Sequence, residues 1–183
     1  MTQTHDRTLR LAIAGLGAIG MTVARCVDKG GIAGMTLAAV SARDVEKARE
    51  RVADFSNPPE ILPLEQLGND ADIIVESVPA ANFEKVARPA LEKGRTFMPL
   101  SVGAMLNHMD LVDLARENGG RIVVPTGALI GLDAVRAAAS GGLKTVKLTT
   151  RKPPGGLMDA PYVVENEIDL EGLTEAKLLF SGS

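Results

Sequence analysis

Cysteine and histidine are scarce in this chain of 183 residues, which contains one Cys and two His. The single cysteine, Cys26, cannot form an intrachain disulfide, and so few potential ligands argue against a zinc site. Cys26 falls among the apolar positions of a predicted helix. We therefore expect it to be a small core residue rather than a nucleophile.

Long hydrophobic runs are also missing, and none approaches the roughly 20 residues that cross a bilayer. Residues 1–7 lack the apolar core of a secretory signal, so we expect a cytoplasmic protein with no membrane partner. The net charge of −3 and the lack of a basic patch argue against a nucleic-acid surface. The chain is 45% hydrophobic and 23% charged, which is typical of a globular protein with a buried core.

The most informative stretch is an apolar run at residues 9–14 followed by the pattern G-x-G-x-x-G at residues 15–20. The run predicts a strand, and apolar residues then recur at helical spacing as far as Val27. Strand, glycine turn and helix in this order are typical of a dinucleotide-binding fold. The alternative is a glycine-rich turn in another α/β protein that binds no dinucleotide.

Each glycine of this motif has a predicted task. Gly15 permits a tight turn, Gly17 leaves space for a pyrophosphate, and Gly20 lets the helix approach the strand. Ala18 and Ile19 open the helix, whose free amides would face the phosphates.

Strands and helices alternate along the next hundred residues. Further strands are predicted at residues 35–40, 61–62, 72–79, 96–100 and 121–124, and helices at 44–55, 82–93 and 106–117. Continuous apolar runs are typical of parallel strands that are buried on both faces. We therefore predict a Rossmann-type, doubly wound parallel sheet over residues 1–125.

The rest of the chain has a different pattern. A helix is predicted at residues 132–140, followed by a strictly alternating strand at 144–150, and residues 162–164 and 176–180 could add strands. Alternation is typical of a half-buried strand in a mixed or antiparallel sheet. We expect a second, α+β domain over residues 126–183, used for substrate binding or dimerisation, and its sheet looks incomplete.

Cofactor candidates lie where the predicted strands end, because ligands of open α/β sheets bind at the carboxyl ends of the strands. An NAD-selective fold usually places an acid after the second strand, but this chain has Ser41 and Arg43 there. Ser41 could bond a ribose 2′-hydroxyl or 2′-phosphate, and Arg43 could pair with that phosphate. We expect NAD or NADP to bind; alternatively, Arg43 is a solvated residue at the start of a helix.

The fourth and fifth strands supply the other candidates, Ser77, Val78, Pro79, Ser101 and Gly103. Their backbone and hydroxyl groups would lie near the nicotinamide ribose. Glu76 is unusual in an apolar strand: it meets the cofactor edge or, the interpretation we favour, is tied to backbone amides. We interpret His108 as a surface histidine rather than a proton shuttle.

Residues 125–134 (PTGALIGLDA) and 149–154 (TTRKPP), with residues 101–104 and the glycine motif, resemble the L-aspartate dehydrogenase family over the whole chain. The resemblance implies NAD(P)-dependent oxidative deamination of L-aspartate to iminoaspartate, a step of pyridine nucleotide biosynthesis. It also implies a cofactor contact at Ala128. We further expect a homodimer.

Family members continue through a segment with a cofactor-contacting asparagine and then the active-site histidine. Neither has a counterpart in these 183 residues, so we expect the family's histidine to lie beyond Ser183 and assign no catalytic residue. The chain is thus expected to be truncated. If it truly ended at Ser183, we would expect weak dinucleotide binding and little or no activity.

An aspartate site needs cations for two carboxylates. Arg151 and Lys152 are candidates, with Thr126 as a hydroxyl donor, although a solvated basic loop or a structural ion pair is the simpler explanation of the two cations. The alternative functions are a homoserine dehydrogenase-like or dihydrodipicolinate reductase-like oxidoreductase, and a dinucleotide-binding module without catalysis.

Overall fold

The structure is a computed structural model that describes residues 7–125 and 132–182. The chain divides into two compact units between residues 132 and 133. We call residues 1–132 unit 1 and residues 133–183 unit 2, and we describe each by itself. Among the described residues, no helix combines the length and the apolar content needed to cross a membrane.

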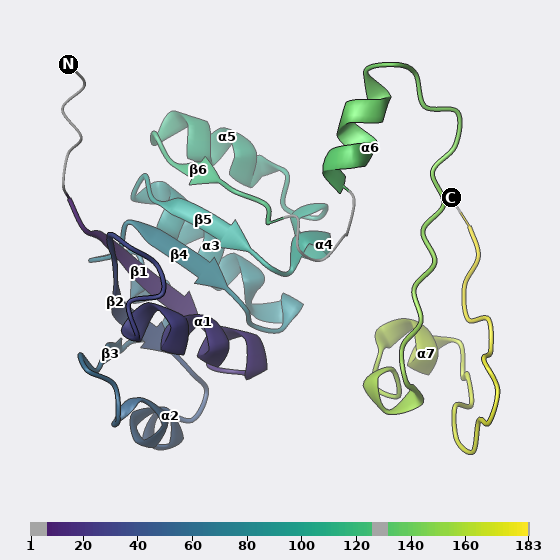
Figure 1. Ribbon diagram of the computed structural model, residues 1–183, viewed down its shortest axis with the longest axis horizontal. Helices are drawn as coiled ribbons and strands as arrows, with labels where there is room; N and C mark the ends of the chain where they lie inside the picture. The colour runs from purple at the N-terminus through teal and green to yellow at the C-terminus, as the bar shows by residue number, and fades with distance from the viewer. Residues whose placement is uncertain (1–6, 126–131, 183) are drawn as a thin grey trace. The chain divides into compact units, whose positions relative to one another are not determined.

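Unit 1 is built on a parallel sheet with the strand order β3-β2-β1-β4-β5-β6 (Figure 1). The strands are β1 (Leu9–Ala14), β2 (Met35–Ser41), β3 (Glu60–Ile61), β4 (Ile73–Glu76), β5 (Thr96–Pro99) and β6 (Arg121–Ile122). The chain runs outward from β1 to β3 and then returns to the other side of β1 with β4. The strand order therefore reverses beside β1, where open α/β sheets bind their ligands.

Helices cover both faces of this sheet, as in the predicted doubly wound fold. They are α1 (Ala18–Asp28), α2 (Val45–Val52), α3 (Phe83–Glu92), α4 (Val102–Met105) and α5 (Asp110–Glu117), with short 3-10 turns η1 (Leu64–Gln66) and η2 (Ala80–Asn82). One core cluster joins the sheet to α3 and α5, and a second joins it to α1 and α2. The Rossmann-type fold class is confirmed.

Two expectations for unit 1 are wrong in detail. The predicted helix at residues 106–117 begins only at Asp110, as α5, and residues 106–109 form the turn that follows α4. Leu106, at which the predicted helix began, is 78% exposed and belongs to no core face. Cys26 is exposed, because the buried face of α1 is formed by Gly20, Ala24 and Val27.

Unit 2 contains α6 (Leu132–Ala139, whose first residue belongs to unit 1), the turn η4 (Pro154–Gly156) and α7 (Pro161–Glu165). The strands predicted at residues 144–150 and 176–180 are wrong, because these segments pair with no strand in the described residues. The prediction at 162–164 is also wrong. Pro161 sits in the first turn of α7, where its fixed φ and missing N–H favour a helix.

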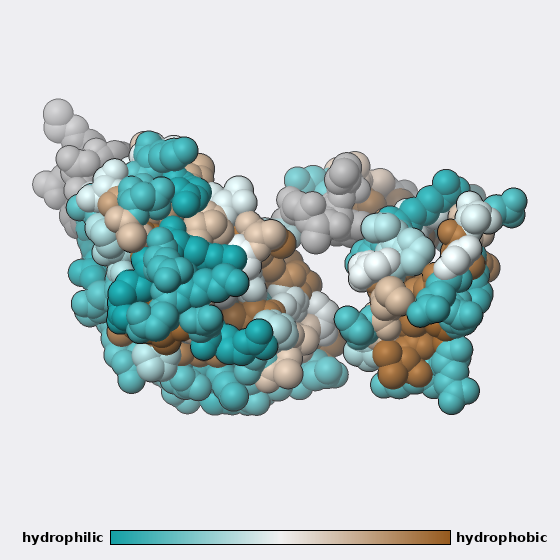
Figure 2. Space-filling view, turned by 90° about the horizontal axis from the view of Figure 1, so that it is seen from below, coloured by the Kyte–Doolittle hydropathy of each residue, from teal (hydrophilic) through white to brown (hydrophobic). Residues whose placement is uncertain are grey.

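The segments at residues 144–150 and 176–180 leave apolar side chains exposed. Val146, Leu148, Leu178 and Phe180 are between 58% and 79% exposed. Figure 2 shows hydrophobic atoms on the visible surface of this unit. Alternation at residues 144–150 gives that segment one polar and one apolar face. An extended segment nevertheless becomes a strand only when another strand pairs with it.

Candidate functional site

The glycine motif forms a tight turn between β1 and α1. Gly15 has a φ of +94°, and its N–H donates to the carbonyl of Ser41 at 2.8 Å. A Cβ on Gly15 would lie 2.6 Å from the Ser77 carbonyl oxygen, and one on Gly20 would overlap the Gly15 carbonyl oxygen. A Cβ on Gly17 would meet nothing within 4 Å. Gly15 and Gly20 are therefore required by the turn itself, whereas Gly17 borders open space.

That open space is a hollow of about 340 Å³. It is lined by Gly17, Ala18, Ile19, Gly20, Ser77, Val78, Leu100 and Ser101. The structure thus brings together residues from the start of α1 and from the loops that follow β4 and β5. Leu100 was missed by the sequence analysis, because its apolar side chain looked like the end of a strand.

Ser77 fixes the glycine turn from the neighbouring strand. Its hydroxyl lies 2.9 Å from the Ala14 carbonyl oxygen and 3.0 Å from that of Gly15, to which it can donate. The hydroxyl is therefore engaged with the protein backbone. We therefore expect Ser77 to contact a ligand in the hollow through its main chain rather than its hydroxyl.

Glu76 is completely buried at the carboxyl end of β4. Its Oε1 accepts from the Val78 N–H at 2.9 Å and from the Ser101 hydroxyl at 3.0 Å, and its Oε2 accepts from the Ser101 N–H at 3.0 Å. The favoured interpretation of Glu76, that backbone amides bind it, is confirmed. Both loops that it binds line the hollow.

Four other candidates lie outside this hollow. Ser41 is the last residue of β2 and is only 4% exposed. Arg43 follows it on the surface and has no ion pair or side-chain hydrogen bond to any described residue. Pro79 and Gly103 are exposed, next to the two loops that Glu76 joins.

A second hollow of about 480 Å³ adjoins the glycine turn and is lined by Gly17, Ala18, Met21, Arg25 and Arg51. Arg51 Nη1 donates to the Leu16 carbonyl at 2.7 Å, which ties the end of α2 to the turn. Sequence reasoning missed Arg51, because a cation in the charged helix α2 looks solvated.

Arg25 is held at the edge of the second hollow by its neighbours. It pairs with Asp54 at 3.1 Å, and its guanidinium lies 5.3 Å from the centre of the Phe55 ring. The hydrogen bond from Arg25 holds the pKa of Asp54 below its usual value. Because Asp54 offsets its charge, Arg25 is a weaker anion ligand than its position alone suggests.

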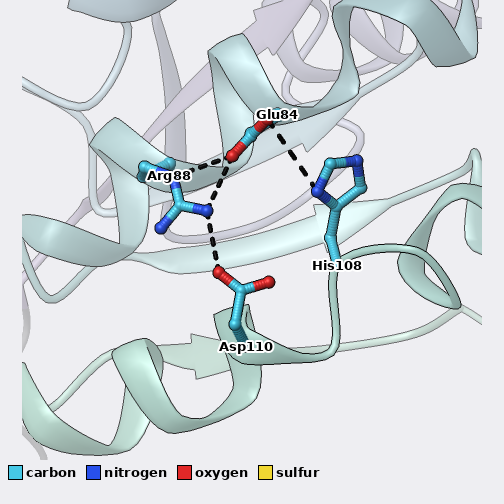
Figure 3. A network of polar contacts seen from close by, with 4 residues as sticks. All are labelled: Glu84, Arg88, His108 and Asp110. Carbon is cyan, nitrogen blue, oxygen red and sulfur yellow. Dashed lines mark hydrogen bonds and ion pairs between the residues drawn. The ribbon is translucent and has the colours of Figure 1, made fainter.

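His108 lies away from both hollows, between α3 and α5 (Figure 3). Its side chain is 27% exposed, and its ring stacks on Phe83 with 5.7 Å between ring centres. His108 Nδ1 is 3.9 Å from Glu84 Oε2, an acidic neighbour that the sequence did not reveal. These contacts indicate that His108 helps to pack α3 against α5.

Arg88 joins the same group of side chains by bridging Glu84 and Asp110, at 2.6 and 2.8 Å (Figure 3). The hydrogen bond from Arg88 lowers the pKa of Asp110. The hydrogen bonds from Asp110 and then Glu84 raise the pKa of Arg88. These residues link α3 to α5 on the protein surface.

The remaining candidates belong to the later part of the chain. Arg151 and Lys152 are exposed in unit 2, where they precede η4. Thr126 and Ala128 lie outside the described residues, and so does Ser183, beyond which we expect the family's histidine. In the described part of the chain, no three His, Cys, Asp or Glu residues converge as metal ligands would. The catalytic residue therefore stays unassigned, and its place beyond Ser183 stays a prediction.

Comparison with protein families divides the chain in two. Residues 15–125 match the family described as "Homoserine dehydrogenase, NAD binding domain", and residues 133–183 match "Aspartate dehydrogenase, C-terminal". The first match covers more than half of the chain.

Curated relatives extend this likeness. The L-aspartate dehydrogenase of Bradyrhizobium diazoefficiens is 49% identical over 181 residues, which cover 99% of this chain and 64% of that protein. L-aspartate dehydrogenase 3 of Bordetella bronchiseptica is 45% identical over 175 residues, which cover 96% and 64%. The chain therefore spans slightly less than two thirds of the length of these relatives.

Solved structures share the fold. A biliverdin reductase from Synechocystis, in complex with biliverdin and NADP+, has a TM-score of 0.56 at 19% identity and covers 73% of this chain and 43% of its own. A scyllo-inositol dehydrogenase from Lactobacillus casei, with bound NAD(H) and scyllo-inositol, has a TM-score of 0.57 at 14% identity and covers 74% and 42%. At these identities the likeness shows the fold alone.

Proposed function

We infer the function from the family: this chain belongs to the L-aspartate dehydrogenases, and its residues 15–125 form an NAD-binding domain of the homoserine dehydrogenase family. It binds NAD or NADP and takes part in the oxidative deamination of L-aspartate to iminoaspartate, a step of pyridine nucleotide biosynthesis. The structural observation that supports nucleotide binding is the hollow between the glycine turn and the loops after β4 and β5.

The residues around this hollow suit a dinucleotide. The first turn of α1 contains no acidic residue, so its positive end can attract phosphates without an opposing charge. Gly17, Ala18 and Ile19 would bind the pyrophosphate, and Val78, Ser101 and Gly103 would adjoin the nicotinamide ribose, with Ala128 as a further contact. When bound, NAD(P) supplies the hydride acceptor, and the protein supplies orientation and a water-poor surface.

We assign the carboxylates of the substrate to Arg151 and Lys152, with Thr126 as a hydroxyl donor. A dicarboxylate taken out of water needs charge-assisted hydrogen bonds. If Arg151 binds a carboxylate, Arg151→Gln raises the KM for L-aspartate about tenfold and leaves the NADH affinity unchanged. The matched control is Arg136→Gln, an exposed arginine of α6 in the same unit.

We assign the adenosine ribose to Ser41 and Arg43, at the end of β2. Loss of a guanidinium from a 2′-phosphate removes a charge-assisted hydrogen bond, so Arg43→Ala weakens NADPH binding about tenfold or more. NADH affinity stays within about twofold, because NADH lacks this phosphate. Titration of both nucleotides measures the difference, with Arg49→Ala on α2 as the control. Equal losses for both would remove Arg43 from this role.

The decisive experiment titrates the protein with NADH and NADPH and then compares oxidation of L-aspartate with that of L-homoserine. We expect nucleotide binding and a clear preference for aspartate. Homoserine is the necessary competitor, because the family of residues 15–125 is named for homoserine dehydrogenase. Turnover of homoserine alone contradicts the substrate assignment, and binding without any turnover by a protein that includes the family's histidine favours a non-catalytic module. If neither nucleotide binds, the proposal fails entirely.

We also propose a cytoplasmic homodimer with domains at residues 1–125 and 126–183. The change of matching family between residues 125 and 133 supports this boundary. The exposed apolar side chains of unit 2 support self-association, since large exposed apolar patches mark interaction sites. Light scattering on the purified protein tests the dimer.

A further inference from the structure

Glu76 occupies a central place at the edge of the sheet where the candidate site lies. It is the last residue of β4, and its sheet neighbours in register are Ala14 of β1 and Pro99 of β5. β1 leads into the glycine turn and β5 leads into the loop that carries Ser101. Glu76 therefore lies among the backbone segments that form the hollow.

The carboxylate uses its hydrogen-bonding capacity on two loops. Its donors are the Val78 N–H from the loop after β4, and the N–H and hydroxyl of Ser101 from the loop after β5. The Ser101 hydroxyl also lies 3.1 Å from the Val78 carbonyl oxygen. Both loops are thus fixed to one buried side chain, and through it to each other.

A carboxylate is unfavourable at a position with no exposed surface unless its partners compensate. An unpaired buried charge costs several kcal/mol, and apolar residues of similar volume often replace buried ionic groups without loss of stability. What an apolar residue cannot do here is accept hydrogen bonds from the amides of Val78 and Ser101. Glutamine cannot do so fully either, because its –NH₂ group would face one of those N–H donors.

We propose that Glu76 is a positioning residue that sets the spacing of the loops after β4 and β5 for the nicotinamide half of the dinucleotide. This inference rests on the proposed function, since it requires that a dinucleotide binds in the hollow. It assigns Glu76 no contact with the cofactor. The adenosine half, which we place at Ser41 and Arg43, depends on β2 and on the glycine turn instead.

The test compares a whole dinucleotide with a ligand that lacks the nicotinamide. In Glu76→Gln, a buried N–H loses its acceptor, and we expect the affinity for NADH to fall about tenfold or more. We expect the affinity for ADP, which lacks both the nicotinamide ring and the ribose attached to it, to stay within about twofold. Calorimetric titration of the full chain with each ligand gives both numbers, and the split between them is a result that general destabilisation would not produce.

Asp72 provides the matched control, because it is the carboxylate just before the other end of β4. Its Oδ2 accepts from the Arg10 N–H at 2.9 Å, and its Oδ1 accepts from Arg7 at 2.8 Å. Asp72→Asn also removes a carboxylate that braces this sheet, but far from the two loops. We expect it to lower the melting temperature and to leave the ratio of the two affinities at the wild-type value.

Glu76→Asp covers the case in which the glutamine variant does not fold. It keeps the charge, but it is one methylene too short to reach Val78 and Ser101 together, so it should show the same selective loss at smaller size. Equal losses for NADH and ADP, or no loss for NADH, in a folded Glu76 variant overturn the inference and leave the proposed function intact. If the wild-type protein binds neither ligand, both fail together.

Discussion

The two units of this chain have different hydrophobic patterns and different structural results. In unit 1, apolar runs pair into a parallel sheet that is buried under helices on both faces. In unit 2, the alternating segment at residues 144–150 pairs with no described strand, and the buried apolar side chains among the described residues of this unit are Val163 and Leu170. Every ion pair among the described residues joins two residues of unit 1.

The difference shows that apolar side chains stabilise a fold only where other parts of the protein bury them. Burial of apolar area, not the local preference of a segment, supplies most of the folding free energy. In this chain that burial is concentrated in the sheet of unit 1. Three predictions test this contrast, from its largest expected effect to its smallest.

The largest effect is expected from truncating the core of unit 1. Phe97 has no exposed surface and packs against Phe83, with ring centres 5.5 Å apart. Phe97→Ala should lower the free energy of unfolding by about 3–5 kcal/mol, because it removes buried area and leaves a cavity. Leu148→Ala in unit 2, at a side chain that is 68% exposed, should change it by less than about 0.5 kcal/mol.

Denaturant unfolding followed by circular dichroism measures both variants. A cost for Leu148→Ala that approaches that of Phe97→Ala would show that unit 2 buries this side chain in solution, and the contrast between the units would then be lost.

The second prediction compares two glycines. A Cβ on Gly20 would overlap the Gly15 carbonyl oxygen and lie 2.9 Å from Ser77 Oγ, so Gly20→Ala should cost about 1–3 kcal/mol of unfolding free energy. A Cβ on Gly155 in unit 2 meets nothing within 4 Å, and Gly155→Ala should be neutral within about 0.5 kcal/mol.

Nucleotide binding adds a second measurement to this pair. Gly20→Ala pushes the start of α1 away from β1 and should also weaken NADH binding, whereas Gly155→Ala should not. A Gly20→Ala protein with wild-type stability would mean that the helix does not lie as close to the turn as the structure has it.

The sequence was sufficient for the Rossmann sheet because its signals are local and mutually consistent. The central strands β1, β2 and β4 are short, mostly apolar runs, and turn residues beside such runs allow strands that are buried on both faces to be recognised. The alternating run at residues 144–150 could not be assigned from local signals alone. Its pattern distinguishes two faces, but whether a strand forms depends on a partner that no local signal identifies.

The residues of the candidate site also differ in whether local sequence signals identify them. Gly15, Gly17 and Gly20 could be assigned from sequence, because the turn imposes its geometry on its own residues. Arg51 could not, since its contact with the Leu16 carbonyl joins residues far apart in the chain. Glu76 lies between these cases: its residue type in an apolar strand signalled a buried acceptor, but only the structure identifies Val78 and Ser101 as its donors.

The smallest effect is expected at the surface of unit 1, where Arg88 bridges Glu84 and Asp110. Arg88→Gln should lower the melting temperature slightly at neutral pH, because exposed ion pairs contribute little to stability. Arg136→Gln in unit 2, an exposed arginine with no ion pair among the described residues, should leave the melting temperature unchanged.

The pH dependence of this small effect identifies its cause. Arg88 lowers the pKa of Asp110, so the bridge stabilises the folded state above the unfolded-state pKa of Asp110 and ceases to do so as the pH falls through the lowered value. The melting temperatures of wild type and Arg88→Gln should therefore converge in acid. A gap that persists at low pH would instead assign the role of Arg88 to packing of its side-chain stem between α3 and α5.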